Sequence, residues 1–298
     1  MSTSVKHPTL FLGKKITNSN ALHRSSMTSL QNLTLAVCDV ARQAGQFIRQ
    51  ERESFKAESV ERKHAHDYVS YVDKQSEQLI VESLRQLLPE AGFVTEEGQA
   101  SYTDEEYCWF VDPLDGTTNF LHRYAPFAVS IGLLKGRDIQ LGVVYEICAD
   151  ECFYAWQGGG AWLQQSDRQP QPLHVSTQQF ADALVCLQLP YDSDAYNPII
   201  RQLLMRLYGR VASVRMLGSA AIALCYVAAG RLDAYAEKYI GRWDYMAGAL
   251  LVQEAGGIVT TYGGSPDFTS GNNVVATNGI VHQAMVSELR LAVSNSSK

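Results

Sequence analysis

Two carboxylates, Asp112 and Asp115, follow directly on a short apolar run at residues 108–111. Such a run is typical of a buried strand. Pro113 has no amide hydrogen and a fixed φ, so the hydrogen bonding of that strand should end there. Gly116 permits a tight turn or a close approach of the backbone to a ligand. The polar residues that come next are good caps for a helix that starts at this point: Thr117, Thr118 and Asn119.

These residues predict a cation site that faces an anion site. Two carboxylates at a strand end suit hard divalent cations, which prefer oxygen ligands, and the carbonyl of Leu114 can supply one more. The backbone amides of Gly116 and Thr117, at a helix start, present hydrogen-bond donors to an anion such as phosphate. An isolated Asp-x-x-Asp pair is more often a turn with two solvated carboxylates, but the whole stretch from residue 109 to residue 120 is far more specific.

The segment 112–119 closely resembles the central metal motif of the inositol monophosphatase family, and residues 120–132 continue the match. The resemblance covers the chain from about Met27 to its C-terminus. It implies an α/β fold of mixed α+β character, a layered αβαβα sandwich of the inositol monophosphatase and fructose bisphosphatase type. It also implies a phosphoric monoester hydrolase of the inositol-phosphate type that depends on Mg²⁺ and is sensitive to lithium.

The resemblance adds three carboxylates to the site: Asp73, Glu96 and Asp244. Each lies in a segment similar to a family motif, with one departure from it: Ser70 stands in place of Thr, Thr95 in place of Gly, and Met246 in place of Ala. From the residues alone, Asp73 is also explained as a helix N-cap, and Asp244 as an anion at the positive end of a helix.

Five carboxylates from four separated segments would raise one another's pKa, so cations are expected among them. By the resemblance, Glu96, Asp112 and the Leu114 carbonyl hold one Mg²⁺, while Asp112, Asp115 and Asp244 hold a second. A third, weaker ion would lie near Glu96 and Asp73, which makes two to three ions in all. The implied catalytic residues are Asp73, Thr117 and Glu96, with Thr117, hydrogen-bonded to Asp73, orienting and deprotonating the attacking water.

The resemblance also implies a set of substrate-binding residues, in which Glu237 would accept hydrogen bonds from a polyol hydroxyl. The set is Asp115, Gly116, Thr117, Gly218, Ser219, Ala220, Glu237 and Asp244. Arg215 lies in the same region and has an equal claim to a purely structural role.

Composition narrows the class of protein. The chain has 298 residues, 46% of them hydrophobic, and a net charge of −6 without a long basic run. Neither a nucleic-acid surface nor a membrane surface is therefore indicated. The six cysteines lie mostly in apolar segments and lack a Cys-x-x-Cys pair, so we expect reduced core residues and a cytoplasmic protein.

The pattern of elements predicts two halves behind an extension. Residues 1–26 contain no Asp or Glu and are expected to be a disordered N-terminal extension; an over-extended start site explains them better than a transit peptide. Residues 27–165 are expected to form an α+β half that holds the metal motif. It would contain a helix from residue 28 or 29 to 55, a strand over 67–73, a helix from Asp73 and an antiparallel meander over 127–156. Residues 166–298 alternate strands and helices, as in a layered α/β half.

Several functions remain open at this point. A related phosphatase of sugar phosphates, histidinol phosphate, fructose bisphosphate or 3′,5′-bisphosphate nucleotides would use the same metal residues. The segment Gly116-Thr-Thr-Asn-Phe120 differs from the Gly-Thr-Lys-Glu-Phe typical of the nucleotidases. A different alternative is a family member with an added regulatory role as a partner of the transcription machinery. A homodimer is expected by analogy with the family alone.

Overall fold

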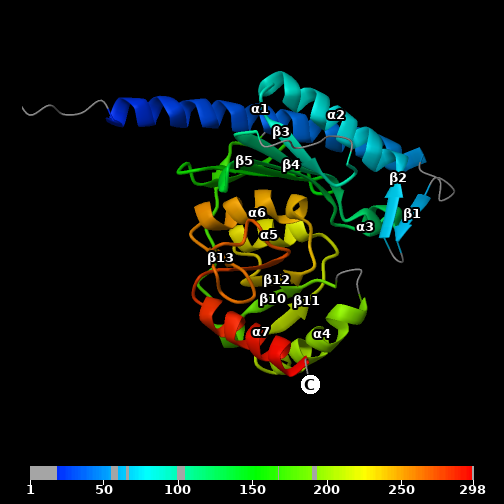
Figure 1. The fold of residues 1–298 in the computed structure, drawn as a ribbon, viewed down its shortest axis with the longest axis vertical. Coiled ribbons are helices and arrows are strands. Elements are labelled where there is room, and N and C mark those ends of the chain that lie inside the picture. The colour runs from blue at the N-terminus through cyan, green and yellow to red at the C-terminus, as the bar shows by residue number, and fades with distance from the viewer. Residues whose placement is uncertain are drawn as a thin grey trace, which may run out of the picture.

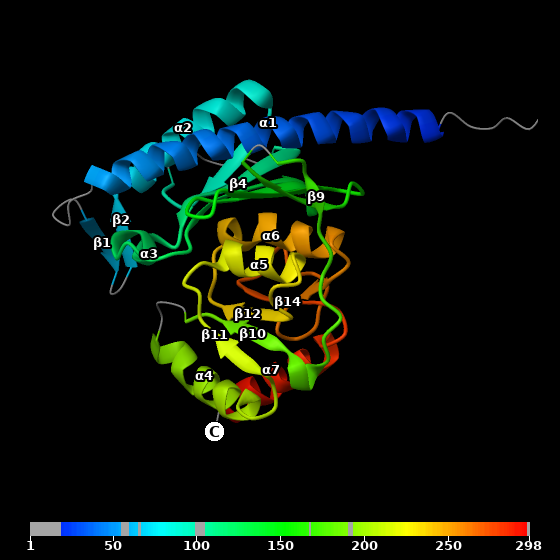
Figure 2. The same ribbon diagram turned by 180° about the vertical axis from the view of Figure 1, so that it is seen from behind.

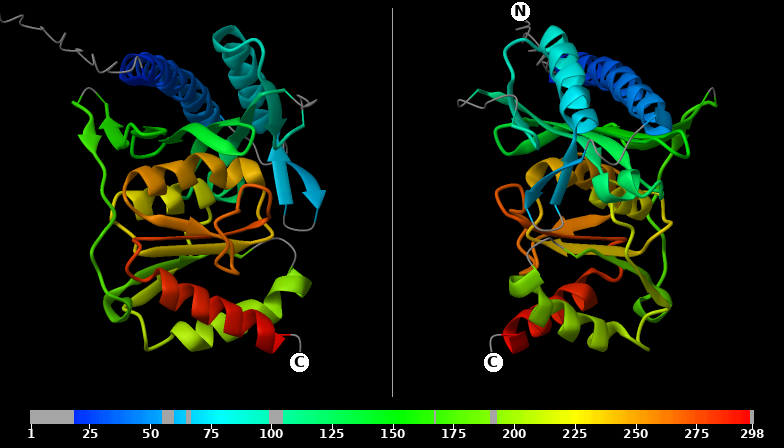
Figure 3. Two further views of the ribbon diagram at one scale, coloured as in Figure 1. Left: turned by 60° about the vertical axis from the view of Figure 1, so that its left-hand side comes forward. Right: turned by 90° about the vertical axis from the view of Figure 1, so that its right-hand side faces the viewer.

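The computed structural model describes residues 19–54, 60–64, 67–98, 105–166, 168–189 and 193–296. These residues form five layers, helices on a sheet on helices on a sheet on helices, which Figure 1 shows from top to bottom and Figure 3 shows from two further sides. The αβαβα sandwich predicted from the sequence is therefore confirmed. None of the described helices is long and apolar enough to cross a membrane.

The first sheet has seven strands in the order β3-β4-β5-β6-β7-β8-β9. Strand β3 is parallel to β4, and each later pair is antiparallel, which confirms the predicted meander. The strands are β3 (Gly92–Thr95), β4 (Tyr107–Asp115), β5 (Ala128–Lys135), β6 (Asp138–Glu146), β7 (Glu151–Trp156), β8 (Ala161–Gln165) and β9 (Gln171–Pro172).

Helices α1 (Ser19–Ser54) and α2 (Tyr71–Leu87) cover the outer face of this sheet (Figure 1). The predicted apolar stripe of α1 faces the sheet, since Val37, Val40 and Ala44 are buried. A hairpin of β1 (Val60–His64) and β2 (Asp67–Ser70) follows α1 and lies beside the layers.

Three element boundaries differ from the sequence-based expectation. Helix α1 begins at Ser19 instead of residue 28 or 29, so the described part of the expected extension is helical, and in Figure 1 it projects beyond the sheet. Residues 1–18 lie outside the described residues. Strand β1 was not expected, because its sequence, Val-Glu-Arg-Lys-His, lacks apolar alternation. Strand β4 does not end at Pro113 as expected but continues to Asp115, because an irregularity in its pairing with β5 between Asp112 and Asp115 accommodates the proline.

The second sheet has five strands in the order β11-β10-β12-β14-β13. Its strands are β10 (Leu184–Leu187), β11 (Ser213–Arg215), β12 (Ala234–Lys238), β13 (Ile258–Thr260) and β14 (Asn273–Thr277). The chain reaches it from β9 by a long connection along one side of the molecule, seen in Figure 2. The division into two domains remains a prediction.

Helices α5 (Ala220–Ala228) and α6 (Arg242–Glu254) form the middle layer between the two sheets. Because both faces of this layer are covered, α5 is apolar nearly all round, and eight of its nine residues are buried. Close approach of α6 to β6 depends on Gly142, where a Cβ would stand 2.4 Å from the carbonyl oxygen of Ala247. The layer brings the N-termini of both helices to the same edge as the end of β4.

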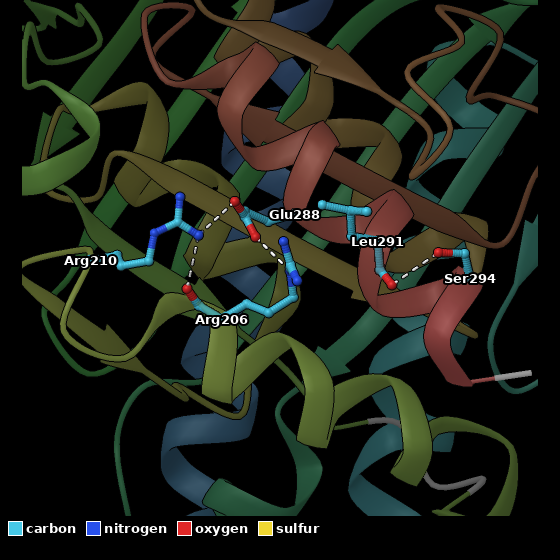
Figure 4. A network of polar contacts seen from close by, with 5 residues as sticks. All are labelled: Arg206, Arg210, Glu288, Leu291 and Ser294. Atoms are coloured by element: carbon cyan, nitrogen blue, oxygen red, sulfur yellow. Dashed lines mark hydrogen bonds and ion pairs between the residues drawn. The ribbon is translucent and has the colours of Figure 1, made fainter. Parts of the chain in front are cut away.

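Helices α4 (Ser193–Leu207) and α7 (His282–Ser296) cover the outer face of the second sheet. Figure 4 shows how Glu288 of α7 joins them. Its carboxylate accepts hydrogen bonds from Arg206 Nε at 2.6 Å and from Arg210 Nη1 at 2.7 Å. The short helices α3 (Thr117–Leu121) and η2 (Phe180–Asp182) complete the described elements.

Candidate active site

One pocket of about 370 Å³ lies where the ends of β3, β4, β10 and β12 meet the starts of α3, α5 and α6. Its size suits a small ligand. Every residue that the sequence placed in the site lines it except Asp73. These lining residues are Glu96, Asp112, Leu114, Asp115, Gly116, Thr117, Gly218, Ser219, Ala220, Glu237 and Asp244.

Asp112 is the centre of a carboxyl cluster. Its side chain is hydrogen-bonded to the carboxyl groups of Glu96 and Asp244, which come from other parts of the chain. Burial raises the pKa of Asp112 well above its usual range, and the charges of Glu96, Asp115 and Asp244 raise it further. Burial and the charges of Glu96, Asp115 and Glu237 likewise raise the pKa of Asp244. Carboxyl groups in such contact must share protons or neutralise their charge in another way.

A buried glutamate on α2, Glu77, fixes the backbone on both sides of Glu96. Glu77 accepts hydrogen bonds from Thr95 Oγ1 at 2.9 Å and from the Glu97 backbone amide at 2.8 Å. These two bonds hold the backbone on either side of Glu96. Sequence analysis did not assign a role to Glu77, because a single Glu in a helical turn is usually solvated; only its complete burial distinguishes it.

Asp115 lies at the N-terminus of α5. Its Oδ2 accepts hydrogen bonds from Ser219 Oγ at 2.5 Å and from the Ala221 amide at 2.7 Å, and its Oδ1 accepts a longer one from the Ala220 amide at 3.3 Å. Burial raises the pKa of Asp115 to about 6, against the opposing effect of these three bonds. Since a carboxylate has about four acceptor positions, Oδ1 keeps capacity for a further partner.

The turn after β4 brings together the catalytic pair expected from the sequence. Gly116 has a φ of 91°, in the left-handed region, and a Cβ there would stand 3.1 Å from the carbonyl oxygen of Gly218. Beyond it, Thr117 Oγ1 lies 3.1 Å from Asp73 Oδ1 and 3.0 Å from the Leu114 carbonyl oxygen. A hydroxyl has one hydrogen to donate and keeps acceptor capacity for a water molecule.

The structure also tests the two helix-end roles that the sequence suggested for Asp73 and Asp244. Asp73 is not the N-cap of its helix, because α2 begins earlier, at Tyr71, and Asp73 lies in its first turn. Asp244 does act as an anion at a helix start, since its Oδ2 accepts a hydrogen bond of 2.9 Å from the Gly241 amide at the N-terminus of α6. Arg215 lies outside the pocket, where its side chain bonds to Ser213 and to the Val214 carbonyl.

Glu237 lines the same pocket. Tyr235 donates a hydrogen bond of 2.6 Å to Glu237 Oε2, and burial raises the pKa of Glu237 to about 8. Gln188, Leu189 and Tyr239 also line the pocket, although nothing in the sequence indicated it. They carry no motif, and only the end of β10 and the chain after β12 bring them to the pocket.

The oxygen atoms that line the pocket are of the kind that a divalent cation requires. Carboxylate and carbonyl oxygens converge here, and these are the ligands that Mg²⁺ prefers. Across the described ranges, no group of three or more ligating side chains is already arranged as a metal ion would require. The chemistry of the residues fits a cation, whose binding would displace the shared protons.

Comparison with known proteins agrees with this geometry. The sequence profile described as the Inositol monophosphatase family matches residues 29–294. The chain is 38% identical over 261 residues to "Nus factor SuhB" of Escherichia coli (strain K12), covering 87% of this chain and 96% of that protein. It is also 38% identical over 230 residues to "Inositol-1-monophosphatase" of Mesorhizobium japonicum, covering 76% and 85%.

A solved structure gives the same answer at the level of the fold. The inositol monophosphatase from Anabaena (Nostoc) sp. PCC 7120 superposes with a TM-score of 0.77 at 34% identity, covering 88% of this chain and 96% of that one. Together, the profile match, the sequence relatives and the shared fold show that the chain belongs to the inositol monophosphatase family and is a phosphoric monoester hydrolase of that family's type.

Proposed function

We propose that the chain is a Mg²⁺-dependent, lithium-sensitive phosphatase that hydrolyses small phosphate monoesters, inositol monophosphates among them, to the free alcohol and phosphate. One observation carries the proposal: carboxyl groups from three separate elements, Glu96, Asp112 and Asp244, meet in one pocket beside the Thr117–Asp73 pair. Such a cluster is costly unless it holds cations.

The residues divide between holding cations and handling the substrate. Glu96, Asp112 and the Leu114 carbonyl would hold one Mg²⁺, and Asp112, Asp115 and Asp244 a second; by the resemblance a third, weaker ion would lie near Glu96 and Asp73. Bound Mg²⁺ supplies charge neutralisation at the phosphoryl and leaving oxygens and lowers the pKa of the attacking water.

Thr117 handles the proton of the attacking water. Its oxygen accepts a hydrogen bond from that water while its own hydrogen is directed to Asp73, 3.1 Å away. The backbone amides of Gly116 and Thr117 would donate to the phosphoryl oxygens, whereas the Ser219 hydroxyl and the Ala221 amide at the start of α5 hold Asp115 in place. Glu237, fixed by Tyr235, accepts a hydrogen bond from a hydroxyl of the leaving group.

A phosphate-release screen tests the proposal directly. The panel contains inositol monophosphates, sugar phosphates, histidinol phosphate, fructose bisphosphate and adenosine 3′,5′-bisphosphate, each with Mg²⁺, with excess chelator and with added Li⁺. We expect turnover of inositol monophosphates that chelator abolishes and Li⁺ inhibits. Full turnover in chelator would overturn the role assigned to Mg²⁺, and turnover confined to another ester would move the chain to a related phosphatase.

A second role receives specific support from the comparisons. The relative from Escherichia coli bears the name Nus factor, so the alternative of a partner of the transcription machinery is better supported by the relatives than the inositol substrate itself. The test is co-purification with RNA polymerase complexes, with Asp112→Asn as a catalytically impaired control. If the parent and the Asp112→Asn variant co-purify with RNA polymerase complexes to the same extent, a second role separate from catalysis is supported. If neither co-purifies, that role is excluded. Gel filtration would test the expected homodimer.

A further inference from the structure

The turn that brings Asp244 to the pocket is held by hydrogen bonds to two separate parts of the chain. Asp244 lies in the first turn of α6, and its Oδ2 accepts a hydrogen bond from the Gly241 amide, so its carboxyl group follows the position of this turn. One outside bond comes from the first sheet, where Ser130 Oγ donates to the Trp243 carbonyl at 3.2 Å. The others come from the connection between β13 and β14.

Tyr245 joins that connection to α6. Its side chain is fully buried, and its hydroxyl oxygen lies 2.9 Å from the carbonyl oxygens of both Phe268 and Gly271. The hydroxyl has one hydrogen, which these two acceptors share. The Gly271 amide also donates to the Phe268 carbonyl at 3.2 Å, so residues 268–271 form a turn around the hydroxyl. Because a buried hydroxyl needs an acceptor, Tyr245 and this turn hold each other in place.

The same connection bonds to the chain just before α6. The Asn272 carbonyl accepts a hydrogen bond of 3.1 Å from the amide of Ile240, a residue that lines the pocket. The segment 268–272 is therefore bonded on both sides of Asp244, to Ile240 before it and to Tyr245 after it. The position of the turn that carries Asp244 thus depends on this segment, and the segment depends on the Tyr245 hydroxyl.

We propose that Tyr245 is a positioning residue for Asp244, and that its hydroxyl bonds to residues 268–271 fix the first turn of α6 where Asp244 would meet Mg²⁺. This role rests on the phosphatase function proposed above. Tyr245 does not line the pocket, so it acts on Asp244 through the backbone. Without its hydroxyl the fold persists, but the Asp244 carboxyl group occupies a wider range of positions. A cation binds less tightly to a ligand that must first be ordered.

Tyr245→Phe tests this role, because it removes the hydroxyl and keeps the ring that packs on Phe268. We expect Mg²⁺ affinity, measured by titration calorimetry without substrate, to fall about tenfold, the lower end of the cost of losing a residue that orients a metal ligand. The Mg²⁺ concentration that gives half-maximal phosphate release should rise by the same factor, while KM for inositol 1-phosphate stays near that of the parent. In the metal-free variant, the Ile240 amide should exchange its hydrogen faster, since its acceptor is no longer fixed.

Tyr145→Phe is the matched control. Tyr145 is also buried, and its hydroxyl donates to Asp150 at 2.7 Å and accepts from Arg49 at 3.2 Å, but it does not line the pocket. This variant loses a buried hydroxyl in the same way and should keep the Mg²⁺ affinity of the parent. Parent-like Mg²⁺ affinity or parent-like exchange of the Ile240 amide in Tyr245→Phe, or an equal loss of affinity in Tyr145→Phe, would overturn this inference alone. A parent protein that does not bind Mg²⁺ would overturn the proposed function and this inference with it.

Discussion

Replacement of Asp244 by Asn separates its structural role from its proposed catalytic role. In the structure, Asp244 Oδ2 accepts a hydrogen bond from the Gly241 amide, and the same carboxyl group contacts Asp112. An Asn side chain can keep both contacts, with Oδ1 accepting from Gly241 and Nδ2 donating to Asp112. The only property removed is the negative charge.

The stability of the metal-free protein should not fall. Loss of the charge at the start of α6 costs about 0.3–1 kcal/mol. Against this, the Asn–Asp112 bond replaces a carboxyl–carboxyl bond that needs a shared proton, and a hydrogen bond to a charged group contributes about 1–1.5 kcal/mol more than one between neutral groups. The net expectation is a gain of up to about 1 kcal/mol, which raises Tm by up to about 2–4 °C. Asp244→Ala, which loses the cap as well, should lie about 1 kcal/mol below Asp244→Asn.

The activity of Asp244→Asn should fall at least about 100-fold in kcat, because one charged group aimed at the transition state is lost. Mg²⁺ should also raise the Tm of this variant less than that of the parent, since ligand binding stabilises by mass action. The assays are phosphate release and thermal melts with and without Mg²⁺. Near-normal turnover together with a normal Mg²⁺ response would refute the reasoning and leave Asp244 as a helix cap alone.

Three further predictions concern other parts of the molecule. Glu77→Ala should lower kcat/KM at least tenfold by releasing the backbone around Glu96, whereas the near-isosteric Glu77→Gln can still bond to Thr95 and the Glu97 amide and should lose less; equal losses would contradict this. Without metal, Tm should fall as pH rises from about 4 to about 8, because burial raises the pKa of Asp115 to about 6 and of Glu237 to about 8, and groups with raised pKa stabilise the fold only while protonated. Added Mg²⁺ should reduce this dependence of Tm on pH. A metal-free Tm that does not change with pH would contradict the prediction. Glu288→Ala should cost about 1–2 kcal/mol of unfolding free energy by leaving Arg206 and Arg210 unpaired, with activity unchanged; its check is a denaturant titration beside the phosphate assay.

Much of this protein follows from local sequence. The apolar run before Asp112 predicts β4, and Gly116 predicts the turn after it, whereas Pro113 was wrongly expected to end the strand. The periodic stripe of α1 and the meander after residue 127 were also found, because each buries one face against a neighbour and so repeats at the period of its element. The resemblance to a family then named the residues that line the pocket.

The sequence was least informative where an element is held by distant partners. Strands β1 and β9 have no apolar alternation in their sequences and are defined by their hydrogen bonds to a neighbouring strand. Tertiary context overrides weak local preference in such segments.

Sequence by itself determined the type of chemistry, because the carboxylates of Asp112 and Asp115 and the turn that holds them lie within a few residues of each other. Only the tertiary structure decided how Asp112 meets Glu96 and Asp244, how Glu77 holds the segment around Glu96, and which other side chains line the pocket. Residues such as Gln188 and Tyr239 have no local pattern, since what they contact is set by the packing of separate elements. Their position in the pocket therefore arises only in the folded chain.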